Sequence, residues 1–137
     1  YDNVVEEVAE EWTMARETAM AAGVAREDIL FDPGIGFAKS AQQSMELIRR
    51  LHEFASLDAP IVVGPSRKSF LNLVESCPPD ERLGASVTAC LESARRGARL
   101  VRVHDVQVTR QALLAQRLIG SCRLSPSMQE GSCSTVS

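Results

Sequence analysis

Apolar residues recur three and four positions apart at the start of the chain, a spacing that places them on one face of an α-helix. The stripe comprises Val5, Val8, Trp12, Ala15, Ala19 and Ala22. It predicts a helix over residues 2–22, with Gly23 as the residue that ends it. Asn3 and Glu6 have the spacing of a capping box. Trp12 lies on this stripe and is interpreted as a core side chain, not as a stacking platform for a ligand.

Three further segments have helical periodicity. Ser40 is placed to cap a second helix, whose predicted apolar side consists of Met45, Ile48, Leu51, His52 and Ala55. His52 is interpreted as a structural residue of that face. Residues 81–96 form a third helix that ends at Gly97, and its inward side chains are predicted to be Leu83, Val87, Cys90, Leu91 and Ala94. Residues 109–119 form a last helix.

Short, continuous apolar runs separate these helices. They lie at residues 29–31, 61–63 and 100–103, and each is followed by turn-forming or polar residues. Apolar strands that alternate with helices predict an α/β fold with a parallel sheet covered on both faces. Two architectures contain such a sheet, the doubly wound open sheet and the (β/α)8 barrel. Three strands cannot close a barrel, so the second alternative requires strands from outside this chain.

Composition and charge narrow the range of partners. The 137 residues are 45% hydrophobic and 24% charged, values typical of one globular domain or part of one. A net charge of −3 and an isoelectric point near 5.4 provide no basic surface for nucleic acid or an anionic membrane. No apolar run has the length of a membrane span and no signal peptide is recognisable, so a cytoplasmic protein is expected.

Cysteine spacing and the two ends of the chain add three expectations. The four cysteines form no CxxC pair and are interpreted as free thiols. The first residue is Tyr1 and not methionine, so the chain is expected to come from a longer protein. Residues 121–137 are rich in serine and have no periodicity, which predicts a disordered tail after a domain over residues 1–120.

The segment GPSRKS, residues 64–69, follows the second strand and combines two hydroxyl groups with two cations. A helical run begins at its end, so the first N–H groups of that helix would point back at the same place. This arrangement suits an anionic ligand that accepts hydrogen bonds. The alternative is a strand-to-helix turn in which a serine caps the helix while Arg67 and Lys68 face solvent.

Polar side chains follow all three predicted strands. Asp32 comes after the first strand and Lys68 after the second. Arg102 and His104 stand at the end of the third. Because the carboxyl ends of parallel strands lie at one edge of a sheet, these side chains are expected to converge. Structural interpretations also exist, in which Asp32 serves a turn, His104 caps the last helix, and Arg102 is buried and paired with Asp105 or Asp32.

The expected cluster suits a planar ligand that carries phosphate groups. Asp32 can accept hydrogen bonds from adjacent N–H groups of an amino-heterocycle, and Lys68 can donate to a ring carbonyl. Arg102 and His104 suit phosphate oxygens. Phe37 follows two glycines and is either a lid over its turn or a ring beside a flat ligand. No nucleophile with an adjacent base is evident, which predicts a site that positions substrates and stabilises leaving-group charge.

Four segments resemble, in order and spacing, motifs of the dihydropteroate synthase family of folate biosynthesis, the target of sulfonamides. They are DPGIGF at residues 32–37, SRKS at 66–69, ERLGAS at 81–86 and RVHD at 102–105. The resemblance extends over about residues 4–119. It implies that this chain is the C-terminal part of a (β/α)8 TIM barrel, with strands six, seven and eight and their helices.

The reaction implied by the resemblance condenses 6-hydroxymethyl-7,8-dihydropterin diphosphate with p-aminobenzoate and releases diphosphate. In the family's dissociative mechanism the diphosphate leaves first and the aniline nitrogen then attacks the pterin cation. By resemblance, the catalytic residues are Asp32, Lys68 and Arg102. The implied substrate-binding residues are Asp32, Phe37, Gly64, Ser66, Arg67, Lys68, Arg102, Val103 and His104. The implied pterin contacts are Asp32, Lys68 and Gly64, the diphosphate contacts Arg102 and His104, and the p-aminobenzoate contacts Phe37 and Ser66.

The same resemblance implies groups that the motifs of this chain do not include. Mg²⁺ and its ligand are expected in the first half of the barrel, together with further pterin-binding residues and a loop for p-aminobenzoate. The chain is therefore expected to need that N-terminal half for activity. Because the late helices form the dimer interface in the family, a homodimer is also expected.

Two alternatives to an active synthase remain open from the sequence. The pterin domain of cobalamin-dependent methyltransferases uses a barrel of the same kind, although the SRKS motif at residues 66–69 argues against it. The other alternative is an inactive half-barrel that keeps the motifs but cannot act alone. Exposed strand edges on its open side would favour aggregation or pairing.

Overall fold

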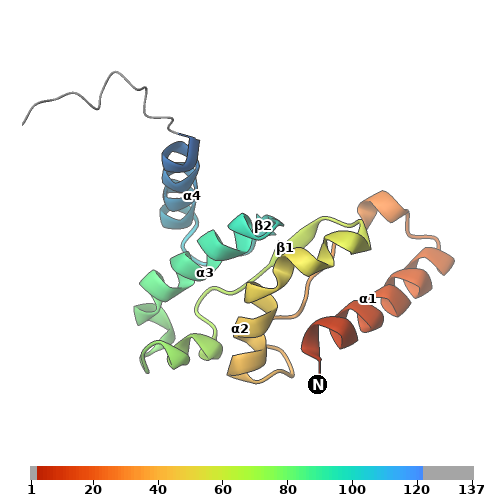
Figure 1. The fold of residues 1–137 in the computed structure, drawn as a ribbon, viewed down its shortest axis with the longest axis horizontal. Helices are drawn as coiled ribbons and strands as arrows, with labels where there is room; N and C mark the ends of the chain where they lie inside the picture. The colour runs from red at the N-terminus through yellow and green to blue at the C-terminus, as the bar shows by residue number, and fades with distance from the viewer. Residues whose placement is uncertain (1–2, 122–137) are drawn as a thin grey trace, which may run out of the picture.

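The computed structural model describes residues 3–121, which form helices around two short strands (Figure 1). The α-helices are α1 (Val4–Ala21), α2 (Ala41–Arg49), α3 (Leu83–Arg95) and α4 (Val106–Ser121), and the strands are β1 (Ile61–Val63) and β2 (Ala98–Val101). Short 3-10 helices lie at η1 (Arg26–Asp28), η2 (Leu51–Leu57), η3 (Ser69–Leu73) and η4 (Pro79–Glu81). Within this part of the chain, no helix has both the length and the apolar character that crossing a membrane requires. The disordered tail was predicted to begin at Ser121, but Ser121 is the last residue of α4; residues 122–137 of that tail lie outside the described residues.

The sheet is built on β1, which pairs in parallel with β2 and places Val63 opposite Val101. On the other edge of β1, Phe31 forms a single parallel bridge, and its carbonyl accepts the Val62 N–H at 2.8 Å. The predicted first strand is therefore reduced to one residue. Pro33 follows two positions later and has no N–H with which to continue the ladder, so the pairing ends there.

One buried apolar cluster holds the helices against these strands. Its members are Val4, Val5, Val8, Phe31, Ile35, Leu47, Ile48, Leu51, Phe54, Ile61, Val63, Phe70 and Leu71. The ring centroid of Phe31 lies 5.2 Å from that of Trp12 and 4.7 Å from that of Phe54. Trp12 meets Phe31 edge-on, with 73° between the ring planes, and its interpretation as a core side chain is confirmed.

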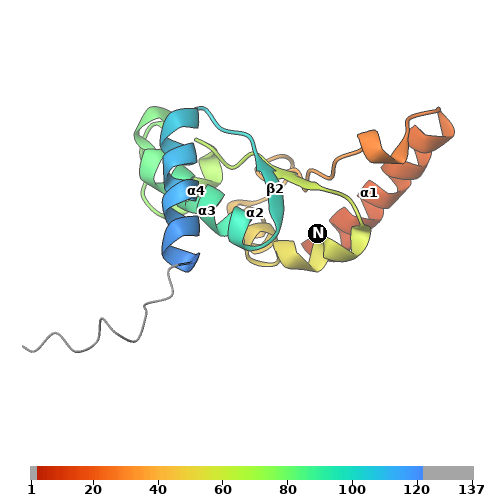
Figure 2. The same cartoon turned by 90° about the horizontal axis from the view of Figure 1, so that it is seen from above.

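The buried stripe of α1 is shorter than predicted. Its buried residues are Val4, Val5 and Val8, whereas Ala15 is exposed, and Figure 2 shows the C-terminal end of the helix extending beyond the other elements. The predicted capping box is wrong, because the Asn3 side chain makes no capping hydrogen bond. The Asn3 N–H instead donates to the carboxylate of Glu7, at 3.1 Å. Gly23, with φ +96°, follows the end of the helix as predicted.

The predicted second helix changes its pitch after α2. Ser40 caps α2 as predicted, and its Oγ accepts an N–H of the first turn at 3.1 Å. Beyond α2 the chain tightens into η2, which has about three residues per turn, so Leu51 and Phe54 both point into the core. His52 and Ala55 are exposed, and their prediction as buried is wrong because the α-helical spacing does not continue through η2.

The core-facing side of α3 carries small and polar residues. Its buried residues are Ser86, Cys90 and Ser93, whereas Leu83, predicted to point inward, is exposed. Burial raises the pKa of the Cys90 thiol to about 11. Among the described residues Cys77 and Cys90 are free thiols, as predicted. β2 starts two residues earlier than predicted, directly after Gly97 ends α3 with φ +109°.

Within the described residues, one side of the sheet has no helices over it, so the prediction of a sheet covered on both faces is wrong. Consecutive α-helices contact each other in chain order, which makes them a single layer. α1, α2 and α3 share one core with the strands, whereas α4 packs against α3 and contributes no residue to that core. On strands flanked by that layer, Leu30 is still 45% exposed and Leu100 is 50% exposed. Apolar side chains of the sheet therefore face a side that these residues do not cover.

The change of pitch at η2 predicts different outcomes for two adjacent substitutions. Leu51→Ala removes a fully buried side chain and should lower the free energy of unfolding by about 3 kcal/mol. His52→Ala changes an exposed side chain in the same short helix and should alter it by less than about 0.5 kcal/mol. Urea unfolding of the two variants measures the difference. Equal losses would contradict the 3-10 pitch.

Candidate functional site

Three loops follow the carboxyl ends of the neighbouring strand segments, and the first begins at Asp32. Its Oδ1 accepts the N–H of Gly34 at 2.9 Å, which closes a tight turn. Gly34 and Gly36 adopt left-handed backbone conformations, with φ +67° and +75°. The Gly36 N–H donates to Ser44 Oγ at 3.1 Å, and this fully buried serine also donates to the Ser40 carbonyl. α2 thus holds the first loop through a side chain that the sequence did not single out.

Lys68 extends from the second loop to the first. Its Nζ lies 3.7 Å from the centre of the Phe37 ring and donates a hydrogen bond to the Ile35 carbonyl. A Cβ on Gly36 would lie 2.8 Å from the Lys68 Cδ, so only glycine leaves room for this side chain. Burial lowers the pKa of Lys68, while the carboxylate of Asp32 acts in the opposite direction.

Arg102 joins the third loop to the first two. Its guanidinium Nη2 lies 3.5 Å from Asp32 Oδ2 and packs against Gly64, where a Cβ would lie 3.1 Å from Arg102 Nε. The side chain is 67% exposed, so the alternative of a buried Arg102 is wrong, although its pairing with Asp32 is observed. Arg102 lies just past the last residue of β2, where the sheet has no covering layer, and this position explains its exposure.

Two adjacent pairs tie the second loop to the third. Ser66 Oγ lies 3.0 Å from His104 Nδ1 and accepts the His104 backbone N–H at 3.3 Å. The Arg67 guanidinium donates to both carboxylate oxygens of Asp105, at 3.2 and 2.8 Å. These hydrogen bonds lower the pKa of Asp105 and raise that of Arg67. Asp105 therefore pairs with Arg67, not with Arg102.

The backbone of Arg67 is held by Ser86 of α3 and by Arg82, which directly precedes α3; neither residue had been predicted to have a role. Ser86 Oγ accepts the Arg67 N–H at 2.8 Å. The Arg82 guanidinium donates to the Arg67 carbonyl at 2.9 Å and to the Cys77 carbonyl at 3.0 and 2.7 Å. Both residues lie within the ERLGAS segment. The one signal in the sequence that could have identified Ser86 is a polar residue at a core-facing position of a helix.

Two expectations about the loops differ from the structure. The segment after Lys68 is η3, a 3-10 helix of five residues, so no long helix directs its N-terminus at this place. Val103 lies on the opposite side from its neighbours in the chain, in a groove that it shares with Val101, Val106 and Leu113. Successive residues of an extended segment point in opposite directions, which separates Val103 from Arg102 and His104.

The resulting cluster combines cations with one carboxylate at the end of parallel strands. Lys68 and Arg102 flank Asp32, and His104 lies on the adjoining loop. Such a set can hold a planar ring by hydrogen bonds and an anionic group by charge. Residues 3–121 contain no group of three or more His, Cys, Asp or Glu side chains that could hold a metal ion.

The pair of Arg67 and Asp105 predicts a loss of stability in acid. Because the folded chain lowers the pKa of Asp105 below its ordinary 3.8, the carboxylate stabilises the fold fully above that pH. The stabilisation is lost as the pH falls from there through the folded pKa. Urea unfolding of the original chain and of Asp105→Asn should show a constant gap in stability from about pH 7 to 5 that shrinks below about pH 4. A gap that persists to about pH 2.5 would contradict the assignment.

The sequence of this chain matches a known protein family. The family described as pterin binding enzyme matches residues 1–104, which include the cluster. A dihydropteroate synthase of Escherichia coli K12 is 38% identical over 113 residues, covering 82% of this chain and 40% of that protein. A probable bifunctional folylpolyglutamate synthase/dihydropteroate synthase of Haloferax volcanii is 47% identical over 106 residues, covering 77% of this chain and 12% of that protein.

A solved structure agrees with these matches. The dihydropteroate synthase from Xanthomonas albilineans, in complex with 7,8-dihydropteroate, superposes with a TM-score of 0.86 and 36% sequence identity. The match covers 90% of this chain and 46% of the solved one, so this chain spans less than half the length of these relatives. The chain belongs to the family of pterin binding enzymes.

Proposed function

We propose that the complete protein is a dihydropteroate synthase and that this chain supplies its C-terminal part. The observation that carries the proposal is the cluster of Asp32, Lys68 and Arg102, which come from three separate loops at one end of the parallel strands. Relatives named as dihydropteroate synthases support it, as does a relative solved with 7,8-dihydropteroate. That compound is the product of joining a pterin diphosphate to p-aminobenzoate.

The uncovered side of the sheet favours a (β/α)8 barrel over a doubly wound sheet. A doubly wound sheet carries helices on both faces, whereas the strands of a barrel turn one face toward each other. The helices of this chain form one layer, and Leu30 and Leu100 are exposed apolar residues of the strand segments. In the described residues β2 pairs with β1 alone and leaves its second edge open. We assign these strands to the sixth, seventh and eighth of the barrel, with the others closing over this face and edge.

Asp32 and Lys68 are assigned to the pterin ring. One carboxylate oxygen of Asp32 is engaged within its own loop, and the other, near Arg102, is directed toward the adjoining loops and can accept ring N–H groups. Lys68 rests on the Phe37 ring and the Ile35 carbonyl, both uncharged. A ring carbonyl of the substrate can therefore replace them without breaking an ion pair.

Arg102 and His104 are assigned to the diphosphate. The exposed guanidinium of Arg102 is held by one long contact with Asp32, which a phosphate oxygen can replace. When Ser66 Oγ donates to Nδ1 of His104, the ring hydrogen sits on Nε2, which becomes a donor for a second phosphate oxygen. Cleavage of the C–O bond leaves its electron pair on the diphosphate, and these donors stabilise the developing charge. The aniline nitrogen then bonds to the methylene carbon and releases a proton.

Phe37 is assigned to p-aminobenzoate by its exposed ring, and Ser66 by the family resemblance alone, because the Ser66 hydroxyl is buried and bound to His104. The Phe37 ring is 59% exposed beside Lys68 and offers a flat apolar surface to an aromatic acid. Arg67 and Val103, the remaining members of the expected substrate-binding set, are engaged elsewhere. Arg67 pairs with Asp105 and Val103 lines a separate groove, so we assign both to the support of the loops.

Further expectations for the complete protein stay predictions. Mg²⁺ would neutralise the charge of the diphosphate, and we place its ligand in the first half of the barrel. A cytoplasmic homodimer and a requirement for that first half are proposed on the same family resemblance. The described residues contribute side chains for the pterin ring, the diphosphate and p-aminobenzoate, and none of the roles assigned to them depends on the metal.

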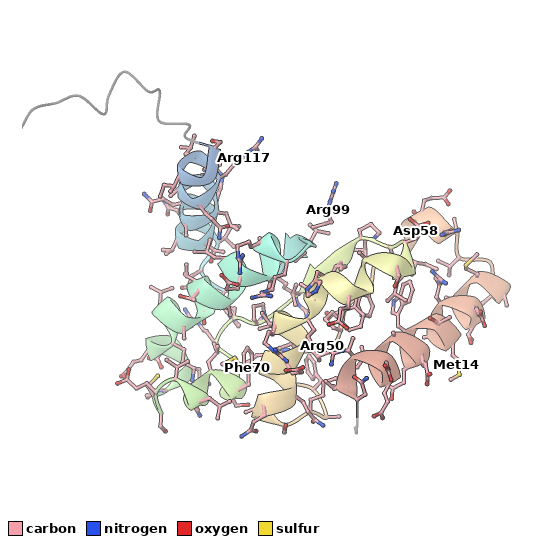
Figure 3. The ribbon with its side chains drawn as sticks, viewed as in Figure 1. Met14, Arg50, Asp58, Phe70, Arg99 and Arg117 are labelled. Atoms are coloured by element: carbon pink, nitrogen blue, oxygen red, sulfur yellow. The ribbon has the colours of Figure 1, made fainter. Side chains whose placement is uncertain are left out.

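Lys68→Ala and Arg102→Ala should each weaken catalysis in the complete enzyme. Loss of a charged contact to the substrate costs about 2 kcal/mol of transition-state stabilisation, or about a thirtyfold fall in kcat/KM. Arg99→Ala is the control, because Arg99 is an exposed arginine of β2 that lies with Ala59 and Gly97 at the opposite end of the strands from the site; Figure 3 shows its side chain extending away from the ribbon. Steady-state kinetics with the pterin diphosphate and p-aminobenzoate measure the effect. Near-original turnover in both site variants would overturn the assignment.

A complementation assay tests the proposed function itself. The purified chain is incubated with pterin diphosphate, p-aminobenzoate and Mg²⁺, with and without a separately made N-terminal half, and dihydropteroate is measured. Product is expected only when the half is added. Product from the chain alone would contradict the requirement for that half. No product from a folded complex of both would overturn the synthase and favour a methyltransferase pterin module or an inactive fragment.

A further inference from the structure

Arg67 holds an unfavourable backbone conformation at the centre of the second loop. Its φ of +59° lies in the left-handed region, which costs a residue with a Cβ about 1 kcal/mol or more. Such a conformation persists only where the surroundings hold it. Arg67 immediately precedes Lys68, so the direction in which Lys68 leaves the turn depends on this one backbone conformation.

Hydrogen bonds with Ser86 of α3 and with Arg82, the residue before α3, hold the Arg67 backbone on both sides. Ser86, itself buried, accepts the N–H at 2.8 Å. The Arg82 side chain belongs to a residue that is only 8% exposed. Its guanidinium donates to the Arg67 carbonyl at 2.9 Å and also to the Cys77 carbonyl. Arg82 thereby joins the start and the end of the chain segment between β1 and α3. The donors of a buried guanidinium are directed at main-chain carbonyls and leave the turn little freedom.

The side chains on either side of the turn reach two different loops. Lys68 crosses to the Ile35 carbonyl and the Phe37 ring of the first loop. The Arg67 guanidinium binds Asp105 of the third loop with two hydrogen bonds. A change at the Arg67 backbone would therefore move both Lys68 and the Arg67 guanidinium. The hydrogen bonds of Ser86 and Arg82 to Arg67 reach the second loop, not the first or the third.

We propose that Arg82 and Ser86 are positioning residues, which hold Arg67 in its left-handed conformation and so aim Lys68 into the site. The expected effect on kcat/KM rests on the proposed function. The expected effect on the conformation of Arg67 rests on the geometry alone. Ser86 acts through the Arg67 N–H, and Arg82 acts through the Arg67 carbonyl. Without either bond the turn relaxes toward negative φ, and Lys68 loses its fixed direction.

The chain offers a matched control for this role. Ser93 is also a buried serine of α3, but its Oγ donates to the Ala89 carbonyl within the helix and does not reach the loop. Ser86→Ala and Ser93→Ala therefore remove the same atom from the same helix. A residue that merely supports the packing of α3 would respond alike at both positions, and a positioning residue would not.

The kinetic test is a double-mutant cycle in the complete enzyme. Ser86→Ala should lower kcat/KM for the pterin diphosphate about tenfold, whereas Ser93→Ala should change it less than about twofold. In a Lys68→Ala background, Ser86→Ala should cost less than about twofold, because the side chain that it positions is already absent. Additive losses would assign Ser86 a general structural role and overturn the proposal.

The structural test needs no activity and uses the chain as it is. Amide hydrogen exchange should show a protected Arg67 N–H in the original chain and in Ser93→Ala, and at least about tenfold faster exchange in Ser86→Ala. Unchanged protection in Ser86→Ala would overturn the proposal even if the synthase activity is present. If Ser86→Ala does not fold, Arg82→Gln, which removes part of the Arg82 guanidinium, is measured in its place. It should also lower kcat/KM about tenfold, and less than about twofold in the Lys68→Ala background.

The two tests separate failure of this inference from failure of the proposed function. An inactive complete enzyme in which Ser86→Ala still exposes the Arg67 amide would overturn the synthase assignment and retain the positioning role. An active enzyme in which Ser86→Ala and Ser93→Ala have the same kcat/KM and the same Arg67 amide exchange would retain the synthase assignment and overturn the positioning role.

Discussion

The chain turns at Arg67 in a left-handed backbone conformation, and the loops that end the strands are all connected to this turn. The guanidinium of Arg67 holds the third loop through Asp105, and the neighbouring Lys68 reaches the first loop. Ser86 of α3 and Arg82, which directly precedes α3, hold the turn itself. Because a left-handed residue with a side chain is unfavourable by itself, the site depends on hydrogen bonds that converge on this one residue.

Buried serines make a second contribution to the geometry of the site. Ser44 on α2 holds the Gly36 N–H, Ser66 holds the His104 N–H, and Ser86 holds the Arg67 N–H. All three serines are buried, and the hydroxyl group of each accepts a hydrogen bond from a loop backbone N–H. A buried N–H without an acceptor is costly, so these hydroxyl groups fix where each loop leaves the core.

The cluster of polar side chains lies at the edge of an incomplete surface. Arg102 and Phe37 are largely exposed, and so are apolar residues of the sheet such as Leu100. Lys68 and Arg102 meet partners that a substrate could displace, whereas Arg67 is held by two short hydrogen bonds to one carboxylate. The chain therefore combines a rigid support with groups that are free to bind, which agrees with a site completed by further residues.

The α/β class, β1 and the glycines that follow α1 and α3 could be predicted from the sequence, because they depend on local periodicity and on residues with special backbone preferences. The sequence also predicted that Asp32, Lys68 and Arg102 would meet, since parallel strands bring their carboxyl ends together. The 3-10 pitch that exposes His52, the pairing of Arg67 with Asp105 and the hydrogen bond from the Arg67 N–H to Ser86 became apparent only in the folded chain. Those depend on which backbone atoms lie nearby after folding, and no spacing along the chain encodes that proximity.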